Sequence, residues 1–458
     1  MTNNKRNTNN IFYIFLTAHL IFWTLVPSLT NQNLPLDTIE ALAWGSNLDW
    51  GFNKHPPLSA FVVKIFYEIF GNQDWAYYLL SQLFVISTFY VVWILSKEFF
   101  LNESNRLVSI LLLEGIFFYN YTTPEFNVYI CELPFWALTV LFCWRGIKNN
   151  KILDWLLFGV FAALGTLSHY LFLYLLAAID IFIIYLLIKK KLNLKCLIFL
   201  STYILVLLPH LIWLKDNNYI TLNYAFTRTG FEEIIFLNHI IHPLTFLGKQ
   251  FGILIPFLIM FLFLFLEFSS KLNLKDKKLL FLLSITILPI ILVFLTSSIL
   301  GVKIRTMWMT PFYLFFGVLA VFFLKRKVDL KKINKFITVF LFLFVLSPVT
   351  YLYVSISEKE KRTDYEGKEI ARLVQVRWDK NFTNEIEVIV GDEWYGGNLS
   401  YHLRTNPIWF YFLDNRFKSV KTDGGFIFTQ KKKLLTKEMC PGLYGSINNQ
   451  AICMIGTK

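Results

Sequence analysis

Charged residues are scarce in this chain: Asp, Glu, Lys and Arg together make up 16% of its 458 residues. Hydrophobic residues make up 55%, aromatic residues make up 18%, and the mean hydropathy is +0.51. So apolar a composition exceeds what a single soluble core needs and is typical of a polytopic membrane protein. The net charge of +13 does not indicate a nucleic-acid partner, because the basic residues are spread between the apolar runs.

Several familiar patterns are absent from the sequence. It contains no Walker loop and no G-x-G-x-x-G fingerprint, so nothing points to a bound nucleotide. No internal repeat, heptad pattern or low-complexity segment stands out. The apolar run at 11–28 follows Lys5 and Arg6, but no small-x-small site closes it, so we expect a first spanning helix that is retained.

About eleven apolar runs come close to the roughly 20 residues that a helix needs to cross the hydrocarbon core. The stretch 152–188 is broken only by Ser168-His169-Tyr170, and we expect two short helices joined at that break. The expected spans are 11–28, 74–95, 107–121, 126–144, 152–168, 171–188, 196–214, 246–268, 279–298, 307–324 and 336–354. They define a predicted transmembrane domain over residues 1–354.

Lys and Arg are distributed unevenly between alternate loops. They gather in the loops at 145–151, 189–195, 271–278 and 325–335, and they are few in the loops between. Because cytoplasmic loops carry an excess of Lys and Arg, the N-terminus is predicted to be cytoplasmic. With an odd number of spans, the residues after the last span lie on the outer face.

Charged residues return after the last apolar run. Runs at 386–390, 409–412 and 426–429 read as strands and 398–403 reads as a helix, so we expect a small α/β domain over residues 355–458. Cys440 and Cys453 lie in this domain, and whether they form a disulfide stays open. Three more cysteines fall in expected spans, where apolar packing explains them; they are Cys131, Cys143 and Cys196.

The first outer loop, residues 29–73, is too long for a simple connection. Asp37 and Glu40 are three residues apart, which places them on one face of a helix. Aromatic residues along the loop and the pair Pro56-Pro57 favour two amphipathic helices lying on the membrane surface, the second starting at the prolines. The same spacing of two acidic residues also occurs on an ordinary solvent-exposed helix face, so this alternative to a catalytic role stays open.

Five motifs, taken together and in order, resemble the C-type (GT-C) glycosyltransferases that use a polyprenyl-phosphate sugar. The resemblance covers about the first 320 residues. This group includes the lipid A aminoarabinose transferase, related transferases of lipid A and lipopolysaccharide core and, more distantly, the protein mannosyltransferases. The motifs are Asp37 and Glu40 followed by W-G-x-x-x-H-P-P-L, Thr123-Pro124-Glu125, Gly159 to Tyr170, Pro209 to Trp213, and Arg305 to Trp308 with Pro311.

This resemblance implies a bacterial inner-membrane enzyme whose outer loop 29–73 is catalytic. The implied donor is a sugar on undecaprenyl phosphate, and the implied acceptor is lipid A or lipopolysaccharide core on the periplasmic face. The transferred sugar, an amino sugar or a uronic acid among the options, stays open. A protein acceptor is the alternative within the class, and a lipid or glycolipid flippase is the alternative outside it. Membrane lipids are the other expected partners.

The chemistry of such a transfer assigns roles to the outer-face residues. A base must accept a proton from an acceptor hydroxyl, and cations must stabilise the departing phosphate. Asp37 and Glu40 are the predicted catalytic carboxylates, with Asp37 as the base. The predicted phosphate contacts are Arg305, Lys303, Lys54, His55 and Arg228, and the predicted sugar or acceptor contacts are Glu125, His169 and Tyr170. Plainer roles stay open: a helix cap for Glu125, a structural histidine at His55 and a headgroup anchor at Arg305.

Two positions depart from the family pattern. Relatives often carry an acidic residue where this chain has Lys54, which argues against a metal ligand in the first loop. Many carry Asp-Glu where this chain has Asp37-Thr38, which leaves Glu40 as the nearest second carboxylate. His239 and His242, three residues apart, are a weak metal-binding pattern. Whether a divalent metal ion is a cofactor therefore stays open.

Overall fold

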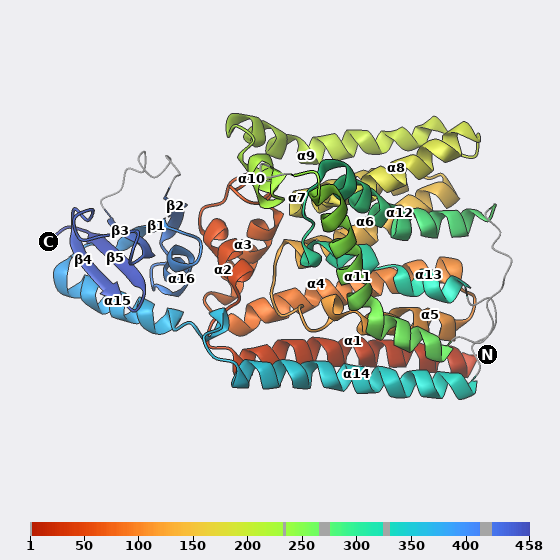
Figure 1. Cartoon of the computed structure of the whole chain (residues 1–458), viewed down its shortest axis with the longest axis horizontal. Helices are drawn as coiled ribbons and strands as arrows, with labels where there is room; N and C mark the ends of the chain where they lie inside the picture. The colour runs from red at the N-terminus through yellow and green to blue at the C-terminus, as the bar shows by residue number, and fades with distance from the viewer. Residues whose placement is uncertain (1, 232–234, 265–274, 324–329, 413–423) are drawn as a thin grey trace.

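The computed structural model describes residues 2–231, 235–264, 275–323, 330–412 and 424–458. Long helices run side by side along the long axis of the molecule, and the small sheet of the C-terminal domain lies beyond one end of them (Figure 1). The N-terminus lies at the opposite end. The chain is therefore a polytopic helical protein with a domain attached to one end of its helices.

Seven helices in the described part of the chain are long and apolar enough to cross a membrane, or eight if the bent pair η5–α13 is counted as one span. Two shorter apolar helices, α7 and α8, meet at the break predicted near His169. These elements are α1 (Thr2–Thr30), α4 (Asp74–Phe99), α6 (Val128–Asn149), α7 (Ile152–Ser168), α8 (Phe172–Ile188), η3 (Leu194–Ile198) with α9 (Phe199–Asp216), α11 (Asn238–Leu264), α12 (Lys277–Leu300), η5 (Thr306–Tyr313) with α13 (Phe316–Phe323), and α14 (Leu330–Ser357).

The run expected to span at 107–121 differs from the prediction. It forms the short helix α5 (Glu103–Leu111) and two 3-10 turns, η1 (Leu112–Gly115) and η2 (Phe117–Tyr119). The side chain of Asn120 donates a hydrogen bond to the carbonyl of Glu114, and Glu114 itself is buried beside His19. The Asn120 side chain thus bonds a backbone carbonyl within a turn, where a continuous helix would have used that carbonyl itself.

The first outer loop forms two helices, as predicted. α2 (Leu36–Ser46) begins after Pro35, and α3 (Leu58–Phe70) begins after Pro56-Pro57. Gly71, at a φ of 59°, ends α3 because a residue without a Cβ adopts this left-handed conformation without strain. The two helices lie between the long helices and the C-terminal domain (Figure 1).

The C-terminal domain is built on a five-stranded sheet with the order β2-β1-β3-β5-β4. β1 pairs in parallel with β2 and β3, whereas β5 pairs antiparallel with β3 and β4. The predicted strands and the predicted helix are present, and α15, β4 and β5 add to them. The elements are η6 (Arg362–Asp364), α15 (Gly367–Asn381), β1 (Ile386–Gly391), α16 (Tyr395–His402), β2 (Ile408–Tyr411), β3 (Gly425–Lys431), β4 (Leu443–Ile447) and β5 (Gln450–Ile455).

The first loop and the C-terminal domain share one hydrophobic core. Trp44 and Phe52 of the loop belong to the same buried cluster as Trp378 and Ile389 of the domain. Gly397 allows α16 to approach α2 closely, because a Cβ at this position would lie 3.1 Å from the Cβ of Ala43. This packing fixes the start of α16 beside the carboxylates of α2.

The cysteines divide as their positions suggested. Cys440 and Cys453 form a disulfide that joins the segment before β4 to β5. Cys131, Cys143 and Cys196 are free and buried. The disulfide lies at the β4 edge of the sheet.

Candidate active site

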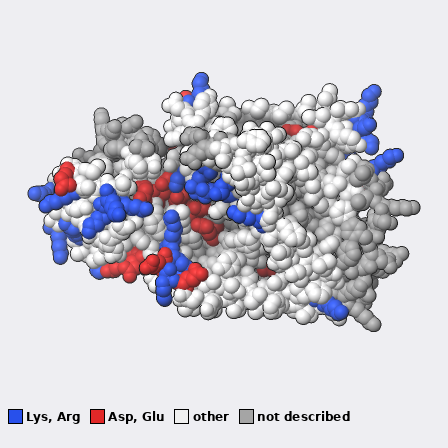
Figure 2. Space-filling model, viewed as in Figure 1, with Lys and Arg blue, Asp and Glu red and all other residues white. Residues whose placement is uncertain are grey.

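A cavity of about 740 Å³ lies where the first loop, the long helices and the C-terminal domain meet. Figure 2 shows acidic and basic side chains side by side at this junction, whereas most of the visible helical face carries few charges. The ionisable and aromatic residues that line the cavity are Asp37, Glu40, Lys54, His55, Glu125, Tyr129, His169, Tyr170, Tyr224, Arg228, Arg305, Trp308, Arg362, Asp392, Glu393 and Trp394.

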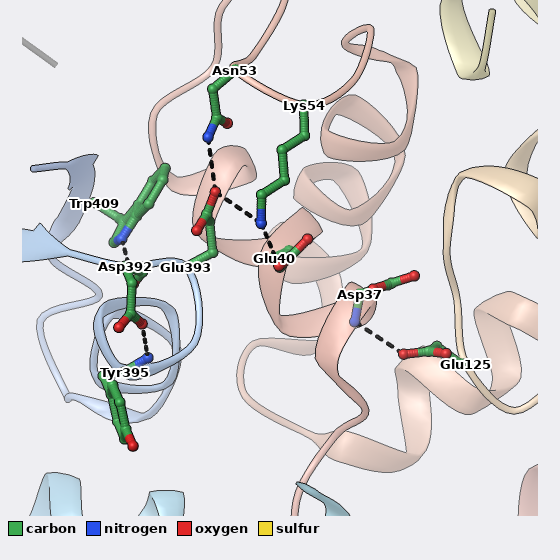
Figure 3. A network of polar contacts seen from close by, with 9 residues as sticks. All are labelled: Asp37, Glu40, Asn53, Lys54, Glu125, Asp392, Glu393, Tyr395 and Trp409. Atoms are coloured by element: carbon green, nitrogen blue, oxygen red, sulfur yellow. Dashed lines mark hydrogen bonds and ion pairs between the residues drawn. The ribbon is translucent and has the colours of Figure 1, made fainter. Parts of the chain in front are cut away.

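Asp37 lies in the first turn of α2 and faces the cavity. Its backbone N–H donates a hydrogen bond to Glu125 Oε1 at 3.0 Å, which joins the first loop to the Thr123-Pro124-Glu125 motif (Figure 3). Burial, together with the negative charge of Glu125, raises the pKa of Asp37 to about 7. A carboxyl group of this pKa is matched to accepting a proton near neutral pH.

Glu40 lies one turn further along α2 and contacts Lys54. The Lys54 ammonium lies 2.8 Å from Glu40 Oε1 and 3.2 Å from Glu393 Oε1 of the C-terminal domain (Figure 3). Asn53 also donates a hydrogen bond to Glu393 at 2.9 Å. Burial raises the pKa of Glu40 to about 7 despite the lysine, and the two carboxylates raise the pKa of Lys54.

Three arginines from separate segments line the cavity: Arg228, Arg305 and Arg362. None of them forms an ion pair within the described part of the chain, and the guanidinium of Arg362 lies 5.2 Å from the ring centre of Trp394. Their planar, multiply donating groups suit phosphate oxygens. Lys303 differs from the prediction because it is exposed and does not line the cavity.

Two histidines line the same cavity. The ring centres of His55 and His169 are 5.6 Å apart. Burial lowers the pKa of His169 to about 3 and lowers the pKa of His55 well below its usual value. Both imidazoles are therefore neutral around pH 7, and each provides one N–H donor and one acceptor.

Tyr170 lines the cavity but also holds the first loop in place. His210 Nδ1 lies 2.6 Å from the carbonyl oxygen of Trp50, and its Nε2 lies 2.8 Å from the Tyr170 hydroxyl. A carbonyl only accepts, so Nδ1 carries the hydrogen and the tyrosine hydroxyl donates to Nε2. The Pro209 to Trp213 motif thus anchors the chain just before Lys54 and His55.

The residues present do not fit a divalent metal ion. His239 and His242 each contact a backbone carbonyl through Nδ1, and among the described residues no Cys, Asp or Glu is grouped with them to complete a metal site. Glu40 and Glu393 are occupied by the Lys54 ammonium. Within the described ranges, no group of three or more His, Cys, Asp and Glu side chains is arranged to hold a metal.

Several cavity residues were not predicted from the sequence. Arg362, Asp392, Glu393 and Trp394 come from the C-terminal part, which the motifs did not cover. Asp392 accepts a hydrogen bond from the N–H of Tyr395, the first residue of α16, at 2.6 Å (Figure 3). The packing of α16 on α2 brings Asp392, Glu393 and Trp394 to the site. Trp308 was part of a quoted motif but received no role.

Comparisons with known proteins agree with the motif-based resemblance. The family described as dolichyl-phosphate-mannose-protein mannosyltransferase matches residues 54–213. Among curated proteins, none matches the chain. The crystal structure of ArnT from Cupriavidus metallidurans bound to undecaprenyl phosphate matches with a TM-score of 0.67 and 11% identity, covering 96% of this chain and 97% of that chain. The archaeal oligosaccharyltransferase AglB from Archaeoglobus fulgidus, in complex with an inhibitory peptide and a dolichol-phosphate, has a TM-score of 0.38 and 9% identity, covering 86% and 64%.

The match with ArnT extends over nearly the whole chain, C-terminal domain included. It shows a shared fold, and it confirms the resemblance to C-type glycosyltransferases inferred from the ordered motifs. The motif that contains Lys54, His55 and the two prolines opens the matched segment 54–213, and Pro209 to Trp213 closes it.

Proposed function

We propose that this chain transfers a sugar from a polyprenyl phosphate, undecaprenyl phosphate in a bacterium, to an acceptor on the outer face of the membrane. One observation carries the proposal: Asp37, a carboxyl with a pKa of about 7, shares a cavity with arginines that form no ion pair among the described residues. This is the combination of base and phosphate-binding cations that the reaction needs. The shared fold and the matched family support it.

The proposed reaction breaks the bond between the anomeric carbon and the phosphate oxygen. An acceptor hydroxyl oxygen attacks the anomeric carbon, and its proton passes to the Asp37 carboxylate. The phosphate leaves with the bonding electron pair as polyprenyl phosphate, and Arg305, with Arg228, stabilises its negative charge. Glu125 is positioned to contact sugar hydroxyls, and the neutral His55 and His169 can each donate a hydrogen bond to the sugar or to its phosphate. If the acceptor oxygen belongs to a phosphate, no proton needs to be removed.

The place of the cavity favours an enzyme over a flippase. A transporter site is expected near the bilayer midplane, between repeated halves of the protein. Here the charged residues gather at the end of the helices that faces the C-terminal domain (Figure 2). Transport is the alternative function, and the experiments described below distinguish it from sugar transfer.

The proposed orientation places this cavity in the periplasm and the N-terminus in the cytoplasm. The N-terminus and the C-terminal domain lie at opposite ends of the helices (Figure 1), and further Lys and Arg side chains lie at the end away from the domain (Figure 2). This arrangement supports an inner-membrane protein that follows the positive-inside rule. Single cysteines placed in loop 29–73 should react with a membrane-impermeant reagent from outside; labelling from the cytoplasm alone would reverse the orientation.

We propose lipid A or lipopolysaccharide core as the acceptor, on the basis of the family resemblance. Mass spectrometry of lipid A and core from cells with the gene, without it and with Asp37→Asn tests this. We expect one sugar to disappear from the glycolipid in the second and third strains. Unchanged glycolipid with loss of sugar from a surface protein would establish the protein O-glycosyltransferase alternative. If deletion of the gene removes the sugar from the outer face but cells with Asp37→Asn retain it, the result would favour a flippase.

A further inference from the structure

Two histidines in the helical part of the protein lie beside a buried glutamate. His19 Nδ1 is 3.6 Å from Glu114 Oε2, and His169 Nδ1 is 3.7 Å from Glu132 Oε1. Both glutamate side chains are fully buried. An ionisable group at this depth is costly, so it is usually retained for a function or paired for structure.

The two pairs differ in what the histidine can reach. At His19, both ring nitrogens are buried without a hydrogen-bond partner in the described part of the chain. At His169, only Nδ1 is buried without a hydrogen-bond partner among the described residues, and the residue lines the cavity. The pair with Glu132 is thus connected to the active site, whereas the pair with Glu114 is enclosed.

The neighbours of His169 fix which way its ring faces. The ring of Tyr129 lies edge-on to it, with the ring centres 5.0 Å apart. The ring of His55, which also lines the cavity, has its centre 5.6 Å from that of His169. Nδ1 faces Glu132, on α6, so Nε2 lies on the opposite side of the imidazole. Arg305 lines the same cavity.

The protonation of the pair follows from its surroundings. Neither carboxyl oxygen of Glu132 has a hydrogen-bond partner among the described residues, and His169 is the basic side chain that contacts it. An isolated buried charge is strongly disfavoured, so the uncharged pair is favoured: a carboxylic acid and a neutral imidazole. The acid can donate only to Nδ1. The ring hydrogen then resides on Nε2.

We propose that Glu132 is a positioning residue that holds His169 with its Nε2–H directed into the cavity, as a hydrogen-bond donor to an oxygen of the donor phosphate. The 3.7 Å separation closes to a hydrogen bond with a small side-chain shift, as is common when a site fills. A neutral donor adds to the arginines without adding a buried charge. This inference rests on the proposed function, because it takes a polyprenyl phosphate as the ligand.

The test compares side chains of similar size that do and do not donate to Nδ1. Glu132→Gln retains an N–H donor, whereas Glu132→Met retains only the volume. We expect the Kd for undecaprenyl phosphate, measured on the purified full chain in detergent, to rise roughly tenfold in Glu132→Met and to stay within about threefold in Glu132→Gln. His169→Phe should raise the Kd by the same factor as Glu132→Met. The variant that carries both substitutions should bind no more weakly than either single variant.

The enclosed pair provides the matched control. Glu114→Met and Glu114→Gln should each change the thermal stability but leave the Kd for undecaprenyl phosphate at the wild-type value. Wild-type affinity in Glu132→Met, or equal losses in Glu132→Met and Glu132→Gln, would overturn the positioning role. Wild-type protein that binds no undecaprenyl phosphate would instead refute the proposed function, and this inference with it.

Discussion

The ammonium of Lys54 lies 3.2 Å from a carboxylate oxygen of Glu393, so a single side chain joins the first outer loop to the C-terminal domain. The same ammonium lies 2.8 Å from Glu40, which makes it the shared counterion of two carboxylates from different parts of the fold. In this chain the lysine supplies the positive charge between the carboxylates and ties the domain to the cavity.

Lys54→Met should therefore weaken both stability and transfer. Without the ammonium, Glu40 and Glu393 face each other unpaired, and removing one partner of a buried ion pair is destabilising. Because the Lys54 side chain retains 20% exposure, we expect a loss of about 1–3 kcal/mol in the free energy of unfolding. Thermal melting of the purified protein measures the loss, and transfer from a synthetic donor should fall in parallel.

The matched control is Lys64→Met on the neighbouring helix α3. Lys64 pairs with Glu68 one turn on, but the Glu68 side chain is 64% exposed. Exposed pairs contribute little, so the melting temperature should stay close to wild type. If Lys54→Met and Lys64→Met lower the melting temperature equally, the ion pair with Glu393 contributes no more to stability than an exposed one.

Transfer to a hydroxyl acceptor should depend on the protonation of Asp37. Burial and Glu125 raise the pKa of this carboxyl to about 7, and a base works only in its deprotonated form. We expect kcat/KM to rise with pH and to level off above about pH 7. Asp37→Asn should lower kcat at least roughly 100-fold and remove this rise from any residual activity. A flat profile for the wild-type enzyme across this range would exclude Asp37 as the base.

The same raised pKa predicts a cost in stability. A carboxyl whose folded pKa is above its unfolded value stabilises the folded state at low pH, and this contribution is lost as pH rises through the folded pKa. For Asp37 the window runs from its ordinary value of 3.8 to about 7. Asp37→Asn removes the charge, so its melting temperature relative to wild type should increase between pH 5 and 7 and then stay constant.

How much of the site could be predicted from the sequence depended on how local each signal was. The spacing of Asp37 and Glu40 placed both on one face of a helix, and both line the cavity, because helical periodicity is a local property. Arg305 was predicted because it belongs to one of the motifs and because the departing phosphate needs a cation. Lys303 carries the same charge two residues earlier, and only the three-dimensional structure separates the two.

Contacts between distant segments could not be predicted in this way. Glu393 reaches Lys54 only because α16 packs on α2 through Gly397, and no spacing in the sequence encodes that contact. The interruption at 107–121 was missed because apolar length dominated the reading, although Glu114 lies inside the run. Glu132 had a usable signal: an acidic residue inside an expected span at 126–144 is by default a functional candidate.

Arg305 offers the sharpest test of the phosphate-binding side of the cavity, because Lys303 is its natural control. Arg305 lines the cavity, whereas Lys303 is exposed and lies outside it. A guanidinium that stabilises the leaving phosphate acts mainly in the transition state, so Arg305→Ala should lower kcat roughly 100-fold, and Arg305→Lys should recover part of it. Lys303→Ala should stay within about twofold of wild type, because a screened surface charge contributes little. The measurement is transfer from a synthetic polyprenyl-phosphate sugar by purified protein. Equal rates for Arg305→Ala and Lys303→Ala would identify both residues as headgroup anchors and would remove Arg305 from the reaction.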